Sequence, residues 1–162
     1  RLLLYRRPGR LLGAACGAMG YGLPAAIAAK LLAPRRPAFC FAGDGGFMMT
    51  GQELATAKLH GAAPITFVVN NGMYGTIRMH QERRHPGRVS ATTLANPDFA
   101  ALAQAHGCFG AAVTRTDEFV PAFWDAMWSG LPAVIELRVD PEQISVGAAL
   151  SDLRGTMKND VN

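Results

Sequence analysis

The amino-acid sequence predicts an α/β fold in which a parallel β-sheet carries helices on both faces. Short apolar runs alternate along the chain with segments of helical pattern, the order that βαβ units require. Most of these runs are continuously apolar, as expected for strands covered on both faces. A hydrophobic content of 49% against 17% charged residues agrees with a large core and excludes a disordered, highly charged chain.

Four strands are expected at the apolar runs. One helix is expected before the first strand and another between the first and second strands. The runs cover residues 38–42, 64–69, 109–113 and 132–139. An Ala- and Leu-rich helix with Pro24 at its start is expected over residues 23–32, ahead of the first strand. Residues 52–60 have a helical pattern that ends at Gly61.

Two further helices are predicted from their start and stop signals. Asn96, followed by proline, is expected to be the N-cap of a helix that ends at Gly107. Thr116 or Asp117 should cap a helix that ends near Gly130.

The chain length indicates one domain, expected over residues 1–150. A chain of 162 residues is long enough for one sizeable core and too short for two. The polar stretch 83–93 is predicted to be a surface or active-site loop, and residues 151–162 a frayed C-terminal tail. The chain opens on arginine rather than methionine, which suggests a missing upstream segment.

Cysteine usage, charge and hydropathy narrow the class of protein. Cys16, Cys40 and Cys108 lie far apart without CxxC or zinc-site spacing, which favours core cysteines in a reduced, cytoplasmic protein. The net charge of +4 comes from scattered arginines without interleaved aromatics, so nucleic-acid binding is not expected. The sequence shows neither an apolar run of about 20 residues nor a signal peptide, so no membrane association is expected.

A glycine-rich turn, Gly-Asp-Gly-Gly at residues 43–46, directly follows the first predicted strand. Such a turn brings backbone N–H groups up to a ligand, which suits a phosphate. It is not a Walker A loop, because Gln52 and Glu53 occupy the Lys and Ser/Thr positions, and Met48 breaks the GxGxxG pattern. Asp44 would repel a phosphate placed directly on the loop, and an intervening metal ion resolves that conflict.

The second predicted strand ends in Asn-Asn-Gly-Met-Tyr-Gly at residues 70–75. If the two strands are parallel neighbours, both turns lie at the carboxyl edge of the sheet, where ligands of open α/β sheets bind. A carboxylate, an amide oxygen and a backbone carbonyl are hard oxygen donors, and diphosphate oxygens and a water would complete the octahedron that Mg²⁺ demands. The pair of turns therefore predicts a metal–diphosphate site.

Three motifs resemble the cofactor-binding (PP) domain of thiamine-diphosphate enzymes, in the acetolactate synthase and 2-oxo acid decarboxylase group. They are GAMGYGLPAA at residues 17–26, GDGGF at 43–47 and NNGMYG at 70–75. GDG followed after 24 residues by NN is the signature of this family. The resemblance covers nearly the whole chain, and three motifs in order are far more specific than GDG alone.

The resemblance implies a role for each matching residue. Asp44 and Asn71 would supply side-chain ligands to Mg²⁺, and Met73 its main-chain carbonyl. Gly45 and Gly46 would offer backbone N–H groups to the diphosphate of the cofactor.

Gly17 and Met19 are the residues implied to be catalytic. The carbonyl of Gly17 would accept a hydrogen bond from the 4′-amino group of the cofactor, and Met19 would hold thiamine in its bent conformation. Only in that conformation can the 4′-imino nitrogen take the proton from C2, and an apolar wedge both holds the geometry and excludes water. Gly43 and Tyr74 complete the expected cofactor-binding set.

The implied function is that of the thiamine-diphosphate- and Mg²⁺-binding domain of an acetolactate synthase-like lyase or transferase. Such enzymes decarboxylate or ligate 2-oxo acids through a carbanion at C2 of the cofactor. In the family an upstream pyrimidine domain, usually of another subunit, provides a glutamate that protonates N1′ of the cofactor. These residues leave no room for that domain, so the chain is expected to hold half a site and to act in a homo- or hetero-oligomer.

Three alternative functions are compatible with parts of this pattern: the small subunit of a split 2-oxo acid decarboxylase, a 2-oxo acid:ferredoxin oxidoreductase subunit, and a non-catalytic assembly module. The split-subunit form stays open, as do the particular 2-oxo acid and its acceptor. Gly46, where ferredoxin-linked subunits carry aspartate, and the isolated cysteines argue against the second. Intact Asp44 and Asn71 argue against a module that binds no metal.

The histidines and the apolar residues near the motifs complete the predictions. His60 and His106 stand beside helix-ending glycines, where they favour capping, whereas His80 and His85 flank the loop that could approach a substrate. An apolar cluster at the carboxyl edge is expected to face a partner rather than water. It comprises Met19, Phe47, Met48, Met49, Met73 and Tyr74.

Overall fold

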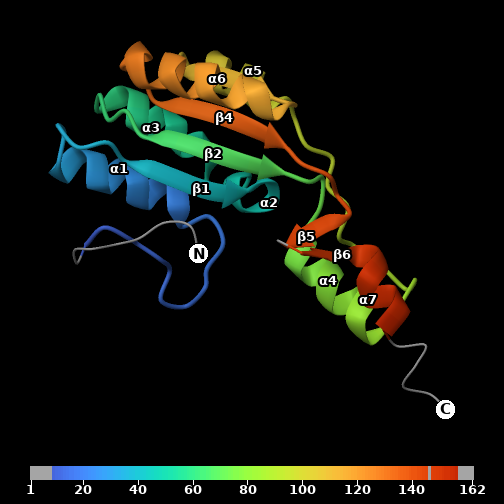
Figure 1. The fold of residues 1–162 in the computed structure, drawn as a ribbon. Helices are drawn as coiled ribbons and strands as arrows, with labels where there is room; N and C mark the ends of the chain where they lie inside the picture. The colour runs from blue at the N-terminus through green and yellow to red at the C-terminus, as the bar shows by residue number, and fades with distance from the viewer. Residues whose placement is uncertain (1–8, 146, 157–162) are drawn as a thin grey trace.

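A four-stranded parallel sheet forms the centre of the computed structural model, which describes residues 9–145 and 147–156 (Figure 1). Its strands lie in the order β1 (Phe39–Gly43), β2 (Ile65–Asn70), β4 (Ala133–Arg138) and β3 (Phe109–Val113). Each begins and ends within one residue of its predicted run. The predicted fold class is confirmed.

Helices cover both faces of this sheet and bury two separate apolar clusters. Helices α1 (Gly22–Leu32), α3 (Leu54–Leu59) and α5 (Phe99–Ala105) contribute to one cluster, and α6 (Thr116–Ser129) contributes to the other. Neighbouring residues of β2 point into different clusters, Val68 into the first and Phe67 into the second. This follows from the alternation of side chains along a strand, and it explains why the apolar runs are continuous.

The helix boundaries correct two predicted caps. Asn96 is not the N-cap of α5: the side chain of Asp98 accepts a hydrogen bond from the backbone N–H of Ala101 at 2.9 Å, and the helix begins after it. The N-cap of α6 is Arg115 rather than either predicted residue. The predicted end of α6 is confirmed, because Gly130 adopts the left-handed conformation (φ 65°) that favours glycine at a helix end.

A second group of elements lies beyond the carboxyl ends of the strands (Figure 1). It contains α4 (Gly75–Arg84), the short antiparallel pair β5 (Gln143–Ser145) and β6 (Ala148–Ala149), and α7 (Leu150–Thr156), which contacts α4. The predicted frayed tail is wrong for residues 151–156, which are helical, and residues 157–162 lie outside the described residues.

Helix α4 was not expected, because its charged and polar residues present no apolar stripe. Its last four residues, Gln-Glu-Arg-Arg, are good helix formers and were the available signal. The predicted loop over residues 83–93 accordingly begins two residues later, since 83 and 84 complete the helix.

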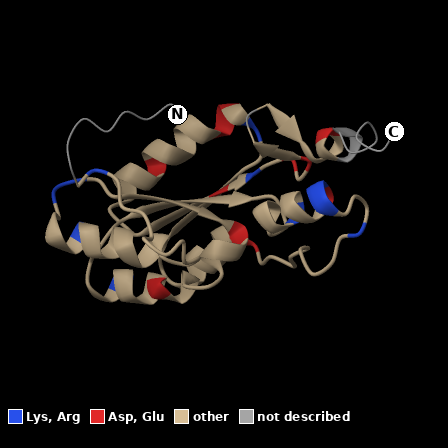
Figure 2. Ribbon diagram, turned by 90° about the horizontal axis from the view of Figure 1, so that it is seen from below, with Lys and Arg blue, Asp and Glu red and all other residues tan. Residues whose placement is uncertain are grey.

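Charged residues stand mostly at helix ends and in loops (Figure 2), and the last turn of α4 carries two arginines. In the part of the chain that the structure describes, no helix is long and apolar enough to cross a membrane. Cys40 and Cys108 are buried as predicted, whereas Cys16 is exposed, so the prediction of core cysteines is wrong for Cys16. Burial raises the pKa of the Cys40 thiol to about 11.

We predict that Gly110→Ala destabilises the protein, because β3 packs backbone to backbone against α5. A Cβ on Gly110 would lie 2.8 Å from the carbonyl carbon of Ala100 and 3.0 Å from its Cα. Chemical denaturation should show a loss of about 1–3 kcal/mol or more. Gly13→Ala is the matched control, since a Cβ there meets open space. Equal unfolding midpoints for the two variants would contradict this account of the packing.

Candidate functional site

The carboxyl ends of β1 and β2 bring the two predicted motifs together. Gly43 is the register partner of Val69, so Asp44 begins the short helix α2 (Asp44–Phe47) beside the end of β2. The second motif follows β2 and turns at Gly72, whose φ of 70° favours glycine. The sheet therefore creates the neighbourhood that the sequence predicted.

A cavity of about 640 Å³ opens at this edge, within the size range of small-molecule sites. Eight predicted site residues line it: Gly17, Met19, Gly43, Asp44, Gly45, Gly46, Met73 and Tyr74. Asn71 is not among its lining residues. Residues from three separate stretches of the chain thus converge on one space.

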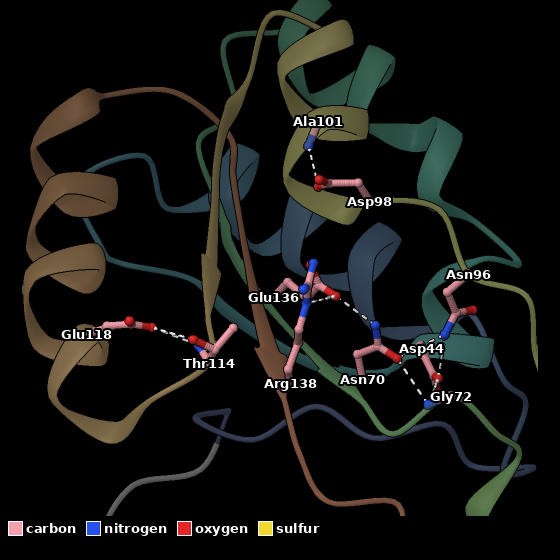
Figure 3. A network of polar contacts seen from close by, with 10 residues as sticks. All are labelled: Asp44, Asn70, Gly72, Asn96, Asp98, Ala101, Thr114, Glu118, Glu136 and Arg138. Carbon is pink, nitrogen blue, oxygen red and sulfur yellow. Dashed lines mark hydrogen bonds and ion pairs between the residues drawn. The ribbon is translucent and has the colours of Figure 1, made fainter.

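The carboxylate of Asp44 is the buried polar centre of the site (Figure 3). Only 2% of this residue is exposed, and its two oxygens have different surroundings. Oδ1 accepts a hydrogen bond from the backbone N–H of Gly45 at 2.9 Å. Oδ2 accepts two, from the backbone N–H of Gly72 at 2.9 Å and from Nδ2 of Asn96 at 2.7 Å.

The same network continues into the sheet through Asn70 (Figure 3). Its Oδ1 accepts from Nδ2 of Asn96 at 2.9 Å and from the backbone N–H of Gly72 at 3.0 Å. Its Nδ2 donates at 2.7 Å to Oε1 of Glu136, a residue of β4 that is 1% exposed.

Arg138 pairs with this buried glutamate. Its Nε lies 3.2 Å from Oε1 and its Nη2 3.4 Å from Oε2 of Glu136. The hydrogen bond to Glu136, followed by the charge of that carboxylate, raises the pKa of Arg138.

Sequence reasoning missed the participation of Asn70, Asn96 and Glu136. A charged residue inside the apolar run of β4 was the available signal for Glu136. Asn96 carried a competing signal, because asparagine before proline is typical of a helix start.

The loop that carries the predicted metal ligands is fixed by its own turn and by the chain before α5. Oδ1 of Asn71 accepts from the backbone N–H of Met73 at 3.2 Å. The N–H of Tyr74 donates to the carbonyl of Thr92 at 2.9 Å, and the N–H of Leu94 to the carbonyl of Gly72 at 2.8 Å. These bonds make a short antiparallel ladder, and they deliver the chain to Asn96.

Among the described residues, the N–H groups in the first turn of α4 have no hydrogen-bond partner, and this turn borders the cavity. The first hydrogen bond of this helix runs from the N–H of Arg78 to the carbonyl of Tyr74, at 2.9 Å. The N–H groups of Gly75, Thr76 and Ile77 therefore have no carbonyl partner within the helix, and these three residues line the cavity. Such a helix end attracts an anion.

Two glycines of the motifs are required by close packing. A Cβ on Gly45 would lie 2.7 Å from Cδ1 of Tyr74, and one on Gly75 would lie 2.8 Å from Nδ2 of Asn71. Larger residues at either position would displace a wall of the cavity or a predicted metal ligand.

The segment before α1 closes the cavity on its other side. Gly17 adopts a φ of 68°, and its N–H donates to the carbonyl of Ala14 at 3.1 Å. Oγ1 of Thr50 donates to the carbonyl of Gly20 at 2.8 Å and ties this segment to the turn after α2. The side chain of Met19 lines the cavity and is half exposed.

The apolar cluster expected at this edge is only partly exposed. Met19, Met48 and Met49 are each nearly half exposed, as a partner-facing surface requires. Phe47 contradicts the prediction: it is buried in the core, with its ring edge against Phe99 at 5.5 Å between ring centroids. The short helix α2 turns this side chain inward.

The histidines lie away from the cavity lining. His60 and His106 are the C-cap residues of α3 and α5, which confirms the predicted capping positions. His80 lies within α4 and His85 at its C-cap, and neither is among the residues that line the cavity.

Comparison with known proteins identifies the family. The family model described as "Thiamine pyrophosphate enzyme, C-terminal TPP binding domain" matches residues 1–137, most of the chain. The chain belongs to this family. Thiamine pyrophosphate, or thiamine diphosphate, is therefore its cofactor, as the sequence motifs predicted.

The relatives that this chain matches include acetolactate synthases. The acetolactate synthase large subunit of Corynebacterium glutamicum is 37% identical over 149 residues, which cover 85% of this chain and 24% of that protein. Acetolactate synthase isozyme 2 large subunit of Escherichia coli is 38% identical over 125 residues, 76% of this chain and 23% of that protein.

A solved structure shares the fold. The thiamine diphosphate-dependent 4-hydroxybenzoylformate decarboxylase of Rhodococcus jostii RHA1 matches with a TM-score of 0.72 and 31% identity, covering 77% of this chain and 24% of that one. The chain thus spans about a quarter of the length of the relatives it matches.

Proposed function

We propose that this chain provides the metal- and diphosphate-binding half of an active site that acts on 2-oxo acids, with thiamine diphosphate and Mg²⁺ as cofactors. The observation that carries the proposal is the cavity at the carboxyl edge, which has a buried carboxylate in its wall and a helix start with free N–H groups beside it. A cation would complement the carboxylate, and an anion would complement the N–H groups at the helix start.

The donor set at this edge fits Mg²⁺. Asp44 offers a carboxylate, Asn71 an amide oxygen and Met73 a main-chain carbonyl, and all three are hard oxygen donors of the kind Mg²⁺ prefers. The buried charge of Asp44 also supports a cation here, because a carboxylate removed from water needs compensation. Asn71 would hold a metal through the free lone pair of Oδ1, since the other accepts from Met73.

The backbone donors fit a diphosphate. Gly45 and Gly46 line the cavity, and so does the first turn of α4. N–H groups at a helix start bind phosphate oxygens without further charged side chains. Asp44 would then meet the diphosphate only across the metal ion, which removes the repulsion between them.

The remaining lining residues fit the thiamine rings. When bound, the cofactor supplies the nucleophilic carbon and the electron sink for cleavage beside a ketone carbonyl. Gly17 would hold the amino group of the pyrimidine ring through its carbonyl, and Met19 would keep the two rings folded and exclude water. Tyr74 would wall the cavity above Gly45, against which its ring packs.

The names of the relatives support a 2-oxo acid as substrate, with decarboxylation or carboligation as the reaction. An aryl 2-oxo acid is the substrate in the name of the Rhodococcus jostii enzyme. We propose that a pyrimidine domain, of the same or another chain, completes the site in a cytoplasmic homo- or hetero-oligomer. The half-exposed methionines beside the cavity support such a contact.

We predict that thiamine diphosphate binds only together with a divalent cation. Two like charges about 4 Å apart repel by about 4 kcal/mol near a protein surface, so a chelator should weaken binding by about 100- to 1,000-fold. Asp44→Asn should abolish the dependence on Mg²⁺, whereas His106→Ala, at a helix end outside the cavity, should change nothing. Calorimetric titration measures the affinity of each variant for thiamine diphosphate with and without Mg²⁺. Equal affinity with and without chelator would contradict a metal ion that bridges Asp44 and the diphosphate.

We also predict that residues 1–162 alone turn over no 2-oxo acid, because the N1′ proton partner belongs to the pyrimidine domain. Pyruvate and benzoylformate consumption should appear only when a matching pyrimidine domain is present. Sustained turnover by the chain alone would refute the proposal of half a site.

A further inference from the structure

We propose that Asn96, Asn70 and Glu136 are positioning residues that orient Asp44 so that a single lone pair, on Oδ1, is left for the metal ion. None of the three lines the cavity, so each acts through Asp44 rather than on a ligand. The inference rests on the proposed function, because it deepens the metal site described there.

The hydrogen bonds of Asp44 account for nearly all of its acceptor capacity. A carboxylate offers about four lone pairs in its plane, two on each oxygen. Both positions on Oδ2 are taken, by Gly72 and Asn96, and one position on Oδ1 is taken by Gly45. The position that remains is therefore on Oδ1, and Asp44 binds a metal through one oxygen only.

The orientation of each amide in the network is dictated by the buried glutamate. The Glu136 carboxylate can only accept, so Asn70 must turn its Nδ2 toward it. The Oδ1 of Asn70 then faces Asn96, so Asn96 must donate a hydrogen bond to it from Nδ2. The two hydrogens of that nitrogen go to Asn70 and to Asp44. Reversing either amide would set oxygen against oxygen.

The network joins three parts of the chain that meet only in the folded protein. Asp44 follows β1, Asn70 ends β2, and Glu136 lies in β4, paired there with Arg138. Only the Glu136 side of this pair is buried, since the side chain of Arg138 is 52% exposed, and a buried charge of this kind can specify one arrangement of its neighbours. Here the charge of Glu136 specifies whether the oxygen or the nitrogen of the Asn70 and Asn96 amides points toward each neighbour.

A carboxylate limited to one oxygen discriminates between divalent cations. Mg²⁺ needs a near-ideal octahedron, whereas Ca²⁺ accepts more oxygens in a looser geometry, carboxylates among them with both oxygens. Saturating Oδ2 therefore favours Mg²⁺, and releasing Oδ2 should favour Ca²⁺.

The test is calorimetric titration of MgCl₂ and CaCl₂ into the full protein with saturating thiamine diphosphate. Asn96→Ala should raise the dissociation constant for Mg²⁺ by about 10- to 100-fold, as loss of an outer partner of a metal ligand does. The dissociation constant for Ca²⁺ should rise less, so the preference of the site for Mg²⁺ over Ca²⁺ should fall. Asp98→Asn is the control, because it lies two residues away and keeps an oxygen to cap α5. It should leave both constants within about twofold.

A second pair of variants tests the orientation of the amides. Glu136→Gln keeps an acceptor where Asn70 and Nε of Arg138 both donate, and should change the Mg²⁺ constant little. Glu136→Leu removes the acceptor and leaves Asn70 free to turn, so it should raise the dissociation constant for Mg²⁺ by about tenfold. Thermal melting of the metal-free variants is recorded alongside, since a reversibly unfolded fraction raises the apparent dissociation constant by the reciprocal of the folded fraction, and the measured constants are corrected for it.

Unchanged metal constants in Asn96→Ala, or a lower melting temperature as its only effect, would overturn the inference. Asp44→Asn separates this failure from that of the proposed function. If that variant loses Mg²⁺ and Asn96→Ala does not, the metal site stands and the positioning role fails. If neither variant affects Mg²⁺, the proposed metal site itself fails.

Discussion

The burial of one carboxylate, that of Asp44, is the constraint on which the site depends. A charge removed from water is tolerated only where donors surround it, and three donors from separate parts of the chain do so here. Each donor requires a local structure: a glycine turn after β1, a left-handed glycine after β2, and an asparagine released from capping a helix. The order of the strands brings these structures to one edge.

The division of labour between fold and site follows from the direction of the strands. The two apolar clusters stabilise the sheet from both faces, while the polar residues gather where the strands end. Glu136 breaks this separation, because it carries a charge into β4. Its hydrogen bond to Asn70 links the interior of the sheet, through Asn96, to the carboxylate of Asp44.

The sequence was sufficient for the sheet, for most helices and for eight of the residues that line the cavity, because each left a local signal. Continuous apolar runs predicted the strands, and GDG with NN predicted Asp44 and its surroundings. The polar helix α4, the role of Asn96 and the inward turn of Phe47 were missed. Their physical causes are contacts between residues far apart in the sequence: α4 packs on α7, Asn96 bonds to Asp44, and Phe47 meets Phe99. Local propensity for a cap or an exposed loop was overridden by these contacts.

The most direct test of the central claim is a crystal structure of the protein with thiamine diphosphate and Mg²⁺. We expect Asp44 to bind the metal through Oδ1 only, while its Oδ2 keeps the hydrogen bonds from Gly72 and Asn96. A metal bound by Oδ2 or by both carboxylate oxygens, or an Asp44 that turns away from the metal, would contradict it.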